Sequence, residues 1–307
     1  MTIDSISPLR AATPSPEDAA AWSYDAAFCR NRGLINSAEQ EKLRNSRVAV
    51  AGMGGVGGID LVTLARLGIG KFTIADPDSF EISNTNRQYG AAFSTLGSMK
   101  ADVMAAIVKD INPEVDIRIF TEPLGPGNVE AFLQDADLLV DGIDFFAMDI
   151  RRMLFNRAAA KGIYGITAGP VGFSGVCIAF DPNGMTFDRY FDLSDTLDEV
   201  EKVVAFVAGV APKATQRSYL DMSAVDVNAH VGPSSSLACQ LAAGTMAAQA
   251  VKILLKRGRV LAAPYYHQFD PYLNRYACSR LIGGNRNPLQ RLKRWLITRY
   301  LRRRLSG

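Results

Sequence analysis

The sequence predicts an α/β fold whose centre is a doubly wound, mainly parallel sheet, extended by extra strands in the second half of the chain. Three observations predict this class. From Arg47 onwards, short apolar runs alternate with stretches of helical periodicity. The first apolar run ends in a glycine-rich turn that leads directly into a helical stretch. With 48% hydrophobic and 21% charged residues over 307 positions, the composition is that of a folded globular protein.

The elements of the first half follow in order from these patterns. Buried strands are predicted at Arg47–Ala51, Phe72–Ala75, Asp116–Phe120, Leu138–Val140 and Gly162–Thr167. Helices are predicted between them at Gly57–Leu67, Lys100–Ile111, Val129–Leu133 and Asp149–Ala160. Strands that alternate with helices pair in parallel, because each crossover helix returns the chain to the end of the sheet at which the preceding strand began.

The second half of the chain has a different rhythm. The elements expected here are a glycine-rich turning loop at Gly169–Gly175, a strand at Gly175–Phe180, a polar and irregular stretch at 181–235, a helix from about Leu237 to Leu255, and strands at Tyr265–Phe269 and Asn274–Ser279. We expect the strands to extend the same sheet and to build the substrate side of the molecule.

The net charge of +3 is unevenly distributed. Residues 281–307 hold eight of the 34 Lys and Arg and none of the 31 Asp and Glu, so 26 basic residues face 31 acidic ones in the rest of the chain. This excludes a chain-wide nucleic-acid footprint. We expect residues 1–22, rich in Ser, Pro and Ala, to form a flexible arm, and residues 286–307 to form a solvated basic tail.

The functional alternative for the tail is contact with an acidic partner, RNA or a membrane surface. Helical geometry places four large apolar residues on one face: Leu289, Leu292, Leu296 and Tyr300. Three cations project onto or beside that face: Lys293, Arg303 and Arg304. This poor separation of charge from apolar surface argues against a membrane-binding helix.

The spacing of the cysteines and the hydropathy of the chain limit further which class of protein this is. The four cysteines, Cys29, Cys177, Cys239 and Cys278, lie far apart and form no C-x-x-C pair, so neither a disulfide framework nor a zinc site is predicted. No signal-peptide pattern opens the chain, and the longest apolar stretches, such as Val203–Ala211, are far shorter than the ~20 residues of a membrane span. A cytoplasmic protein without a transmembrane segment is expected.

The glycine-rich turn has the pattern G-x-G-x-x-G, formed by Gly52, Gly54 and Gly55, and Gly57. Glycines let the backbone turn tightly, so that its N–H groups and the helix dipole bind phosphate oxygens. Asp76 follows Gly57 by 19 residues, at the end of the second strand, where a carboxylate binds ribose hydroxyls. The pattern predicts a nucleotide site and leaves NAD, FAD and ATP open.

Polar residues further along the chain favour ATP. The run Ser83–Gln88 contains Arg87, whose guanidinium can bridge phosphate oxygens. Lys100 begins the next helix, and Asp144 follows the fourth strand at the end where α/β sheets bind ligands. There a carboxylate can hold Mg²⁺. Arg, Lys and Asp together suit triphosphate chemistry.

Over roughly residues 40–260, the sequence resembles the ThiF/MoeB/HesA adenylating enzymes, which are relatives of the ubiquitin-activating enzymes. The resemblance rests on the order and spacing of Gly52–Gly57, Asp76, Asn84–Gln88, Lys100 and Asp144. The resemblance implies a Rossmann-like, ThiF-type domain over residues 23–285, with a nucleotide half at about 40–169 and a substrate half at about 170–285. It also implies an ATP-dependent adenylyltransferase, in which a substrate carboxylate attacks ATP to give an acyl-adenylate and pyrophosphate.

The resemblance assigns the roles of the family's residues to the matching positions of this sequence. The resemblance implies that Asp76 binds the ribose, that Asn84, Arg87 and Lys100 bind the phosphates, and that Asp144 positions Mg²⁺. The charge that develops on pyrophosphate would be offset by Arg87, Lys100 and the metal at Asp144, which are therefore the expected catalytic groups. Family dimers borrow an N-terminal arginine from the partner subunit, and Arg32 is the candidate in a homodimer here.

The sequence departs from the family pattern in three places. It lacks the family's C-x-x-C pairs, so no zinc is expected. Phe145 and Phe146 follow Asp144, where relatives place Asn or Ser. Cys177 and Cys239 are predicted to be packed thiols rather than acyl-accepting nucleophiles, so transfer directly from the adenylate is expected.

The substrate stays open at this point. The carboxylate can belong to the C-terminus of a ubiquitin-like or sulfur-carrier protein, to a ribosomally made peptide, or to threonylcarbamoyladenosine of tRNA. Two other functions remain as alternatives. One is an NAD- or FAD-dependent oxidoreductase, supported by the glycine turn and Asp76 alone. The other is a non-catalytic partner subunit of an adenylating enzyme.

Overall fold

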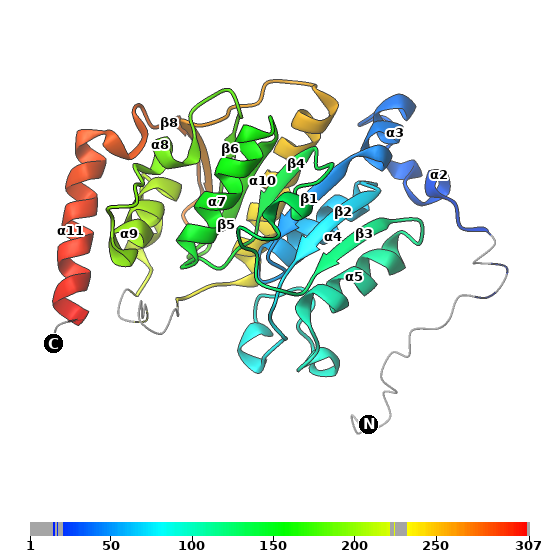
Figure 1. Cartoon of the computed structure of the whole chain (residues 1–307), viewed down its shortest axis with the longest axis horizontal. Helices are drawn as coiled ribbons and strands as arrows, with labels where there is room; N and C mark the ends of the chain where they lie inside the picture. The colour runs from blue at the N-terminus through cyan, green and yellow to red at the C-terminus, as the bar shows by residue number, and fades with distance from the viewer. Residues whose placement is uncertain (1–14, 16, 18–20, 222–223, 225–231, 306–307) are drawn as a thin grey trace.

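The computed structural model describes residues 15, 17, 21–221, 224 and 232–305 (Figure 1). Its centre is one eight-stranded sheet in the order β3-β2-β1-β4-β5-β6-β7-β8. The first five strands of this order pair in parallel: β3, β2, β1, β4 and β5. The last three, β6, β7 and β8, are antiparallel to their neighbours. The predicted fold class, including the extension of the sheet by second-half strands, is confirmed.

The strand bounds lie close to the predicted ones. They are β1 (Arg47–Ala51), β2 (Lys71–Ala75), β3 (Asp116–Phe120), β4 (Leu138–Asp141), β5 (Tyr164–Val171), β6 (Ser174–Phe180), β7 (Tyr265–Asp270) and β8 (Arg275–Arg280). The central strand β1 is buried along its whole length, because helices cover both faces of the sheet. This burial explains why central strands of parallel sheets appear in a sequence as continuous apolar runs.

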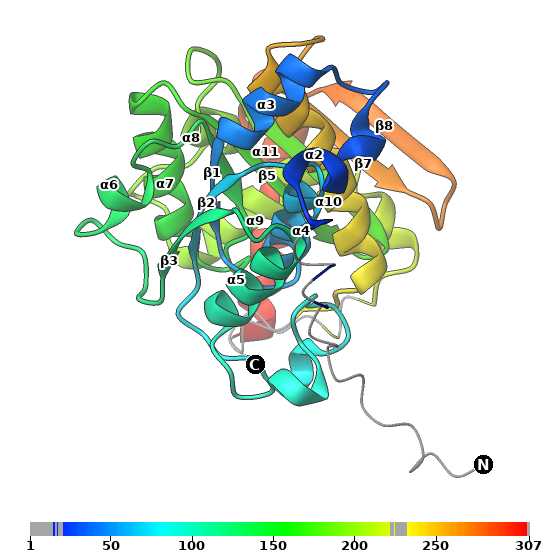
Figure 2. The same ribbon diagram turned by 90° about the vertical axis from the view of Figure 1, so that its right-hand side faces the viewer.

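The helices form a layer on each face of the sheet (Figure 2). One layer holds α3 (Ser37–Asn45), α4 (Gly57–Arg66), α5 (Lys100–Ile111) and α10 (Ser236–Leu255). The other holds α6 (Val129–Phe132), α7 (Met148–Ala160), α8 (Phe187–Phe191) and α9 (Glu199–Val210). The short helix α2 (Tyr24–Ala27) precedes the first layer, and α11 (Pro288–Leu305) ends the chain beside α9. Each layer buries its own hydrophobic cluster against the sheet.

Helix α10 is the one helix among the described residues that is long and apolar enough to cross a membrane. The sequence analysis did not identify it as such. In the structure it packs against β5, β6 and α4, and residues such as Ala242 and Met246 are buried in the core. Small side chains let it approach the sheet closely, as a core helix does.

Two predictions for the second half are wrong. Residues 169–175 do not form a turning loop: β5 continues to Val171, and only Gly172 and Phe173 separate it from β6. Gly172 makes the turn at a φ of +63°, and the residues around it continue the antiparallel ladder. The stretch 181–235 is not irregular throughout, because it contains α8 and α9.

Helix α9 has a local signal that periodicity alone did not show. Asp198 accepts a hydrogen bond from the N–H of Glu201, and the Glu201 carboxylate accepts one from the N–H of Asp198. This reciprocal capping box satisfies two N–H groups at the start of the helix. The apolar run that follows, Val203–Ala211, is then helical almost to its end.

The basic C-terminal segment is not a solvated tail. It forms α11, which packs along α9. The Lys293 ammonium donates to the carbonyl oxygen of Pro212 at 2.6 Å, and the Arg294 guanidinium pairs with Asp192 at 2.8 Å. Arg302 pairs with both carboxylates of the α9 capping box. Acidic groups elsewhere in the chain thus neutralise part of the basic charge and hold the helix in place.

Candidate functional site

At the carboxyl end of β1, backbone atoms of the glycine loop pack closely against one another and against the loop after β4. A Cβ atom on Gly57 would lie 1.8 Å from the carbonyl oxygen of Gly52, and one on Gly52 would lie 2.2 Å from that of Gly142. Gly52 also has a φ of +89°, a region that favours glycine. These three glycines therefore bring the end of β1, the start of α4 and the loop after β4 together.

The other two glycines of the loop face the polar segment that follows β2. A Cβ atom on Gly55 would lie 3.6 Å from Cγ of Arg87, and one on Gly54 would lie 3.7 Å from the side-chain nitrogen of Gln88. Helix α4 starts directly after this loop. Its N-terminal dipole and the loop therefore point toward the same region as Arg87, as a phosphate-binding turn requires.

Asp76 holds the glycine loop in position. Its Oδ2 accepts a hydrogen bond from the N–H of Met53 at 2.6 Å, and its Oδ1 accepts one from the N–H of Asp78 at 2.9 Å. Burial raises the pKa of this carboxyl, and the two backbone donors act in the opposite direction. A carboxylate has further lone pairs beyond these two bonds, so the predicted ribose contact is compatible with this geometry.

The segment after β2 is organised by its own side chains. Asn84 is buried in the 3₁₀ turn Ile82–Asn84, and its side-chain oxygen accepts a hydrogen bond from the N–H of Glu81 at 3.1 Å. The Arg87 guanidinium donates to the carbonyl oxygen of Ser83 at 2.8 Å and to the side-chain oxygen of Asn86 at 3.0 Å. Asn84 thus shapes the turn, and Arg87 is oriented beside the glycine loop.

Lys100 is a buried cation on the same side. It is the first residue of α5, and only 7% of it is exposed. Its Nζ lies 3.0 Å from a carboxylate oxygen of Asp78, and its N–H donates to the carbonyl oxygen of Asp78. Because the N–H of Asp78 binds Asp76, the structure connects Lys100 to the carboxylate that supports the glycine loop.

Asp144 lies in the loop between β4 and α7 and is exposed. Its Oδ1 accepts a hydrogen bond from the N–H of Phe146 at 2.8 Å. Among the described residues, no group of three or more His, Cys, Asp or Glu side chains is placed to hold a metal ion. A single carboxylate still fits Mg²⁺, which proteins commonly bind through one or two carboxylates together with substrate phosphates and water.

Arg151 is a residue of this site that the sequence analysis missed. It lies on α7, and its Nε donates to a carboxylate oxygen of buried Asp141 at 2.8 Å. Its Nη2 donates to the carbonyl oxygens of Ile143 and Asp144 at 2.7 and 3.1 Å. One buried guanidinium therefore fixes the backbone of the loop that carries Asp144.

The two phenylalanines after Asp144 pack toward the core. Their rings lie 5.5 Å apart, and the ring of Phe145 lies 5.3 Å from that of Phe206 on α9. The Arg151 guanidinium lies 4.4 Å from the centre of the Phe206 ring. Phe145 thus attaches this loop to α9.

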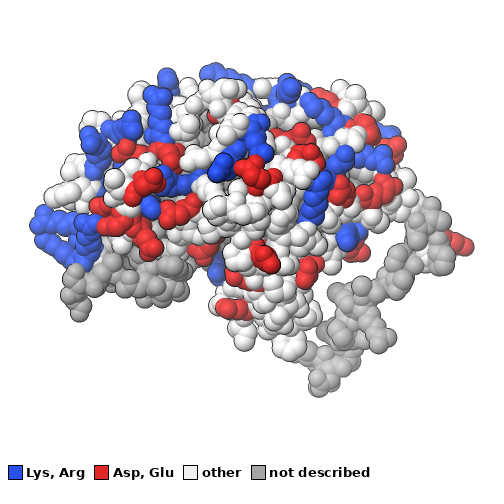
Figure 3. Space-filling view, in the orientation of Figure 1, with Lys and Arg blue, Asp and Glu red and all other residues white. Residues whose placement is uncertain are grey.

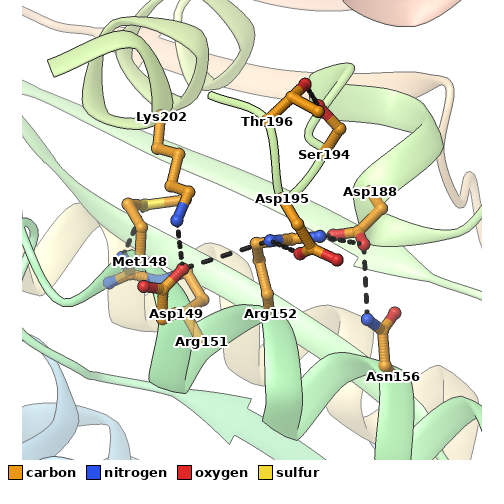
Figure 4. Close-up of polar contacts among 10 residues, drawn as sticks. All are labelled: Met148, Asp149, Arg151, Arg152, Asn156, Asp188, Ser194, Asp195, Thr196 and Lys202. Carbon is orange, nitrogen blue, oxygen red and sulfur yellow. Dashed lines mark hydrogen bonds and ion pairs between the residues drawn. The ribbon is translucent and has the colours of Figure 1, made fainter. Parts of the chain in front are cut away.

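Ion pairs hold α9 and α8 against α7 (Figure 4). Arg152 contacts both oxygens of Asp188 on α8 at 3.0 and 2.9 Å, and Asp195 at 2.9 Å. Lys202 on α9 contacts Asp149 on α7 at 2.7 Å. The side chains of consecutive arginines thus have different roles: Arg151 positions the loop, and Arg152 anchors the neighbouring helices.

Both buried cysteines are packed as predicted. Burial raises the pKa of Cys177 above its ordinary value, and it raises that of Cys239 to about 11. Cys239 lines a cavity of about 230 Å³ together with Arg87, Gln88 and Ser236. A protonated thiol is a weak nucleophile, so this position does not favour acyl capture.

Arg32 lies away from these groups within one chain. It is exposed and follows the 3₁₀ turn Cys29–Asn31. The side chain of Asn31 donates to the carbonyl oxygen of Leu67, at the C-terminal end of α4. Because the glycine loop is at the other end of this ten-residue helix, about 15 Å away, Arg32 does not lie beside its own chain's loop.

Asp60 is a second group that the sequence analysis missed. It lies in the first turn of α4, it is fully buried, and its carboxyl oxygens have no hydrogen-bond partner among the described residues. Burial raises its pKa well above the ordinary value of 3.8, and the nearby charge of Asp141 acts in the same direction. Burial therefore favours the protonated form of this carboxyl in the folded protein.

This protonation predicts a pH dependence of stability. Between pH 3.8 and the raised pKa, unfolding releases the Asp60 proton, so the free energy of unfolding falls by about 1.4 kcal/mol per pH unit. Asp60→Asn has no such proton. We expect thermal melts to show that the variant gains stability relative to the unsubstituted protein as the pH rises from about 4 towards the raised pKa of Asp60. A difference that stays constant over this range would contradict the assignment.

With this geometry established, the chain can be compared with known proteins. The tRNA threonylcarbamoyladenosine dehydratase of Bacillus subtilis is 46% identical over 90 residues, which cover 29% of this chain and 35% of the relative. The protein of that name from Haemophilus influenzae is 39% identical over 123 residues, which cover 40% and 47%. The chain thus matches less than half the length of these relatives.

Solved structures share the fold over more of the chain. The crystal structure of PaaA has a TM-score of 0.62 at 20% identity and covers 92% of this chain and 78% of its own. That of E. coli MccB with ATP has a TM-score of 0.61 at 20% identity and covers 80% and 66%. The model of the ThiF family matches residues 28–291, which is most of the sequence. The chain therefore belongs to the ThiF family.

Proposed function

We propose that the protein is an ATP-dependent adenylyltransferase that activates a substrate carboxylate as an acyl-adenylate. The observation that carries this proposal is the convergence of three segments on the glycine loop. Arg87 contacts the loop from the segment after β2. Lys100 pairs with Asp78, whose N–H binds Asp76, and Asp76 binds the N–H of Met53 in the loop. The segment with Asp144 reaches it through Gly142. Two cations and a carboxylate beside a phosphate-binding turn suit attack at the α-phosphorus of a triphosphate.

The proposed step needs little acid–base chemistry. A carboxylate oxygen of the substrate attacks the α-phosphorus, the bond to the bridging oxygen breaks, and pyrophosphate leaves with its electron pair. The substrate carboxylate is already ionised at pH 7, so no proton has to move. Arg87 and Lys100 bind the phosphates and offset the charge that develops on pyrophosphate. Mg²⁺, bound by Asp144 and phosphate oxygens, would neutralise further charge.

Several features complete the proposal. Asp76 binds the ribose while it keeps the glycine loop in place. A homodimer brings Arg32 of one subunit to the other subunit's phosphates, because Arg32 lies too far from its own loop. The protein works in the cytoplasm. The acyl group passes directly from the adenylate to its acceptor, because burial keeps the thiols of Cys177 and Cys239 protonated.

The acyl substrate is a carboxylate on a small protein, a peptide or a modified tRNA. Two of the curated relatives are named for threonylcarbamoyladenosine of tRNA, so this substrate is the first to test. The oxidoreductase and partner-subunit alternatives differ from the proposal in which nucleotide, if any, the protein binds. Nucleotide binding is therefore the decisive measurement.

The test is thermal unfolding of the protein alone, with Mg²⁺–ATP, with NAD(H) and with FAD. Binding at ~100-fold over Kd stabilises the folded state by ~2.7 kcal/mol, so we expect a clear rise of Tm with Mg²⁺–ATP. Arg87→Ala should reduce the rise, whereas Arg66→Ala, at an exposed position on the far end of α4, should leave it intact. A rise with NAD or FAD alone would support the oxidoreductase, and no rise with any nucleotide would support the partner subunit.

A further inference from the structure

The outer face of α11 exposes a row of large apolar side chains. Their exposed fractions are 70% for Leu289, 53% for Leu292, 55% for Trp295, 52% for Leu296 and 47% for Tyr300. Spacings of three and four residues place them on one side of the helix, opposite the side that packs on α9. Contiguous exposed apolar surface of this kind marks an interaction site.

Basic residues surround this face. No Asp or Glu follows Asp270 in the sequence, and Lys and Arg gather over α11 at the left edge of the molecule in Figure 3. Of the cations that the sequence places on or beside this face, Lys293 does not interrupt the apolar row, because its ammonium binds the carbonyl oxygen of Pro212. Arg299 and Arg303 remain exposed along the C-terminal half of the helix.

A groove adjoins the apolar row. It has a volume of about 890 Å³ and lies between α11 and the residues around the start of α9. Its lining includes Trp295, Arg291, Arg299, Arg302 and Arg303. The Arg299 guanidinium lies 5.4 Å from the centre of a Trp295 ring, so the apolar row and the basic groove meet at these two residues. The two acidic lining residues are already paired, Asp192 with Arg286 and Arg294 and Glu201 with Arg302.

We propose that the outer face of α11 binds an anionic lipid surface. Leucine, tryptophan and tyrosine would enter the boundary between headgroups and acyl chains, and the arginines would bind the phosphates of the headgroups. Charge alone would also attract RNA, but exposed leucines contribute nothing to phosphate contacts or base stacking. Most of α11 lies beyond residue 291, where the match to the ThiF family ends. The proposal does not depend on the adenylation chemistry.

The experiment is co-sedimentation of the full chain with vesicles of phosphatidylcholine alone and of phosphatidylcholine with 30% phosphatidylglycerol. We expect binding to the anionic vesicles that weakens at high salt. Leu292→Gln/Leu296→Gln should weaken it at least tenfold. Arg299→Gln and Arg303→Gln should each weaken it about fivefold, which corresponds to the ~1 kcal/mol expected for one cation near an anionic membrane.

Leu34→Gln is the matched control. Leu34 is as exposed as Leu289 but lies in the sequence between α2 and α3. These helices are at the opposite end of the molecule from α11 (Figure 1), so its substitution should leave vesicle binding unchanged. All substituted side chains are exposed, and an unchanged Tm verifies that each variant folds. A Trp22→Phe background makes Trp295 the only tryptophan, and its emission should shift to the blue on anionic vesicles.

The proposal is overturned if the protein does not bind anionic vesicles, or if binding survives Leu292→Gln/Leu296→Gln. It is also overturned if the protein binds tRNA or polyglutamate at low salt and does not bind vesicles. Those results would assign the face to a nucleic acid or to an acidic protein.

Discussion

Lys100→Met is expected to weaken the binding of Mg²⁺–ATP by about 10- to 100-fold. A hydrogen bond to a charged group contributes ~1.5–3 kcal/mol. Asp78 holds the buried Lys100 ammonium, which under the proposed function binds a phosphate oxygen. Methionine keeps most of the side chain's volume and removes its charge. Isothermal titration calorimetry with ATP in excess Mg²⁺ measures the change without knowledge of the acyl substrate.

Lys109→Met on the same helix is the matched control, because Lys109 is exposed near the other end of α5. It should bind ATP as the unsubstituted protein does. Loss of Lys100 should affect stability little, since its partner Asp78 is largely exposed and such ion pairs contribute ~0–1 kcal/mol. Equal ATP affinity in both variants would remove Lys100 from the site.

Arg151→Met is expected to lower the free energy of unfolding by about 3–5 kcal/mol. The substitution leaves Asp141 as an uncompensated charge in the core, and removal of one partner from a buried ion pair has a cost of this size. It also removes the donors to the carbonyl oxygens of Ile143 and Asp144. Urea denaturation followed by circular dichroism measures the loss of stability.

Two further variants distinguish the causes. Arg157→Met changes an exposed arginine on the same helix and should alter stability by less than ~0.5 kcal/mol. Asp141→Asn combined with Arg151→Met removes the unpaired charge, so the double variant should be more stable than the two separate losses predict. A loss below 1 kcal/mol for Arg151→Met would mean that the pair does not hold the loop.

The coupling of Arg151 to the loop has a functional consequence. Under conditions where Arg151→Met is still folded, its affinity for Mg²⁺–ATP should fall together with the order of the loop that carries Asp144. Arg152→Met, which breaks the pairs with Asp188 and Asp195, should leave that affinity near its original value. The comparison separates positioning of the loop that carries Asp144 from the anchoring of α8 and α9.

The sequence could predict those features that depend on neighbouring residues. Alternation of apolar runs and helical stretches located the strands of the parallel half, and the glycine spacing located the turn after β1. The start of α5 at Lys100 was predicted correctly because helical periodicity begins there. Helix α9 was missed although its signal is local, since Asp198 and Glu201 have the spacing of a capping box.

Other features depend on contacts between segments that are distant in the sequence. Asp141 and Arg151 are ten residues apart and belong to a strand and a helix, so only the packing of α7 on the sheet brings their charges together. The position of α11 depends on acidic groups about 100 residues earlier, at Asp192 and at the start of α9. No local pattern contains this information.

The sequence by itself therefore determined the class of fold, the glycine turn, and the types of residue available to bind a nucleotide. Only the tertiary structure decided that Arg87 and the loop after β4 lie beside that turn and that Lys100 is connected to it through Asp78 and Asp76. It also decided that Arg32 lies away from the turn and that Asp60 has no polar partner among the described residues. The physical reason is the range of the interactions involved. Periodicity and capping act within a few residues, whereas burial and charge pairing depend on the whole packed arrangement.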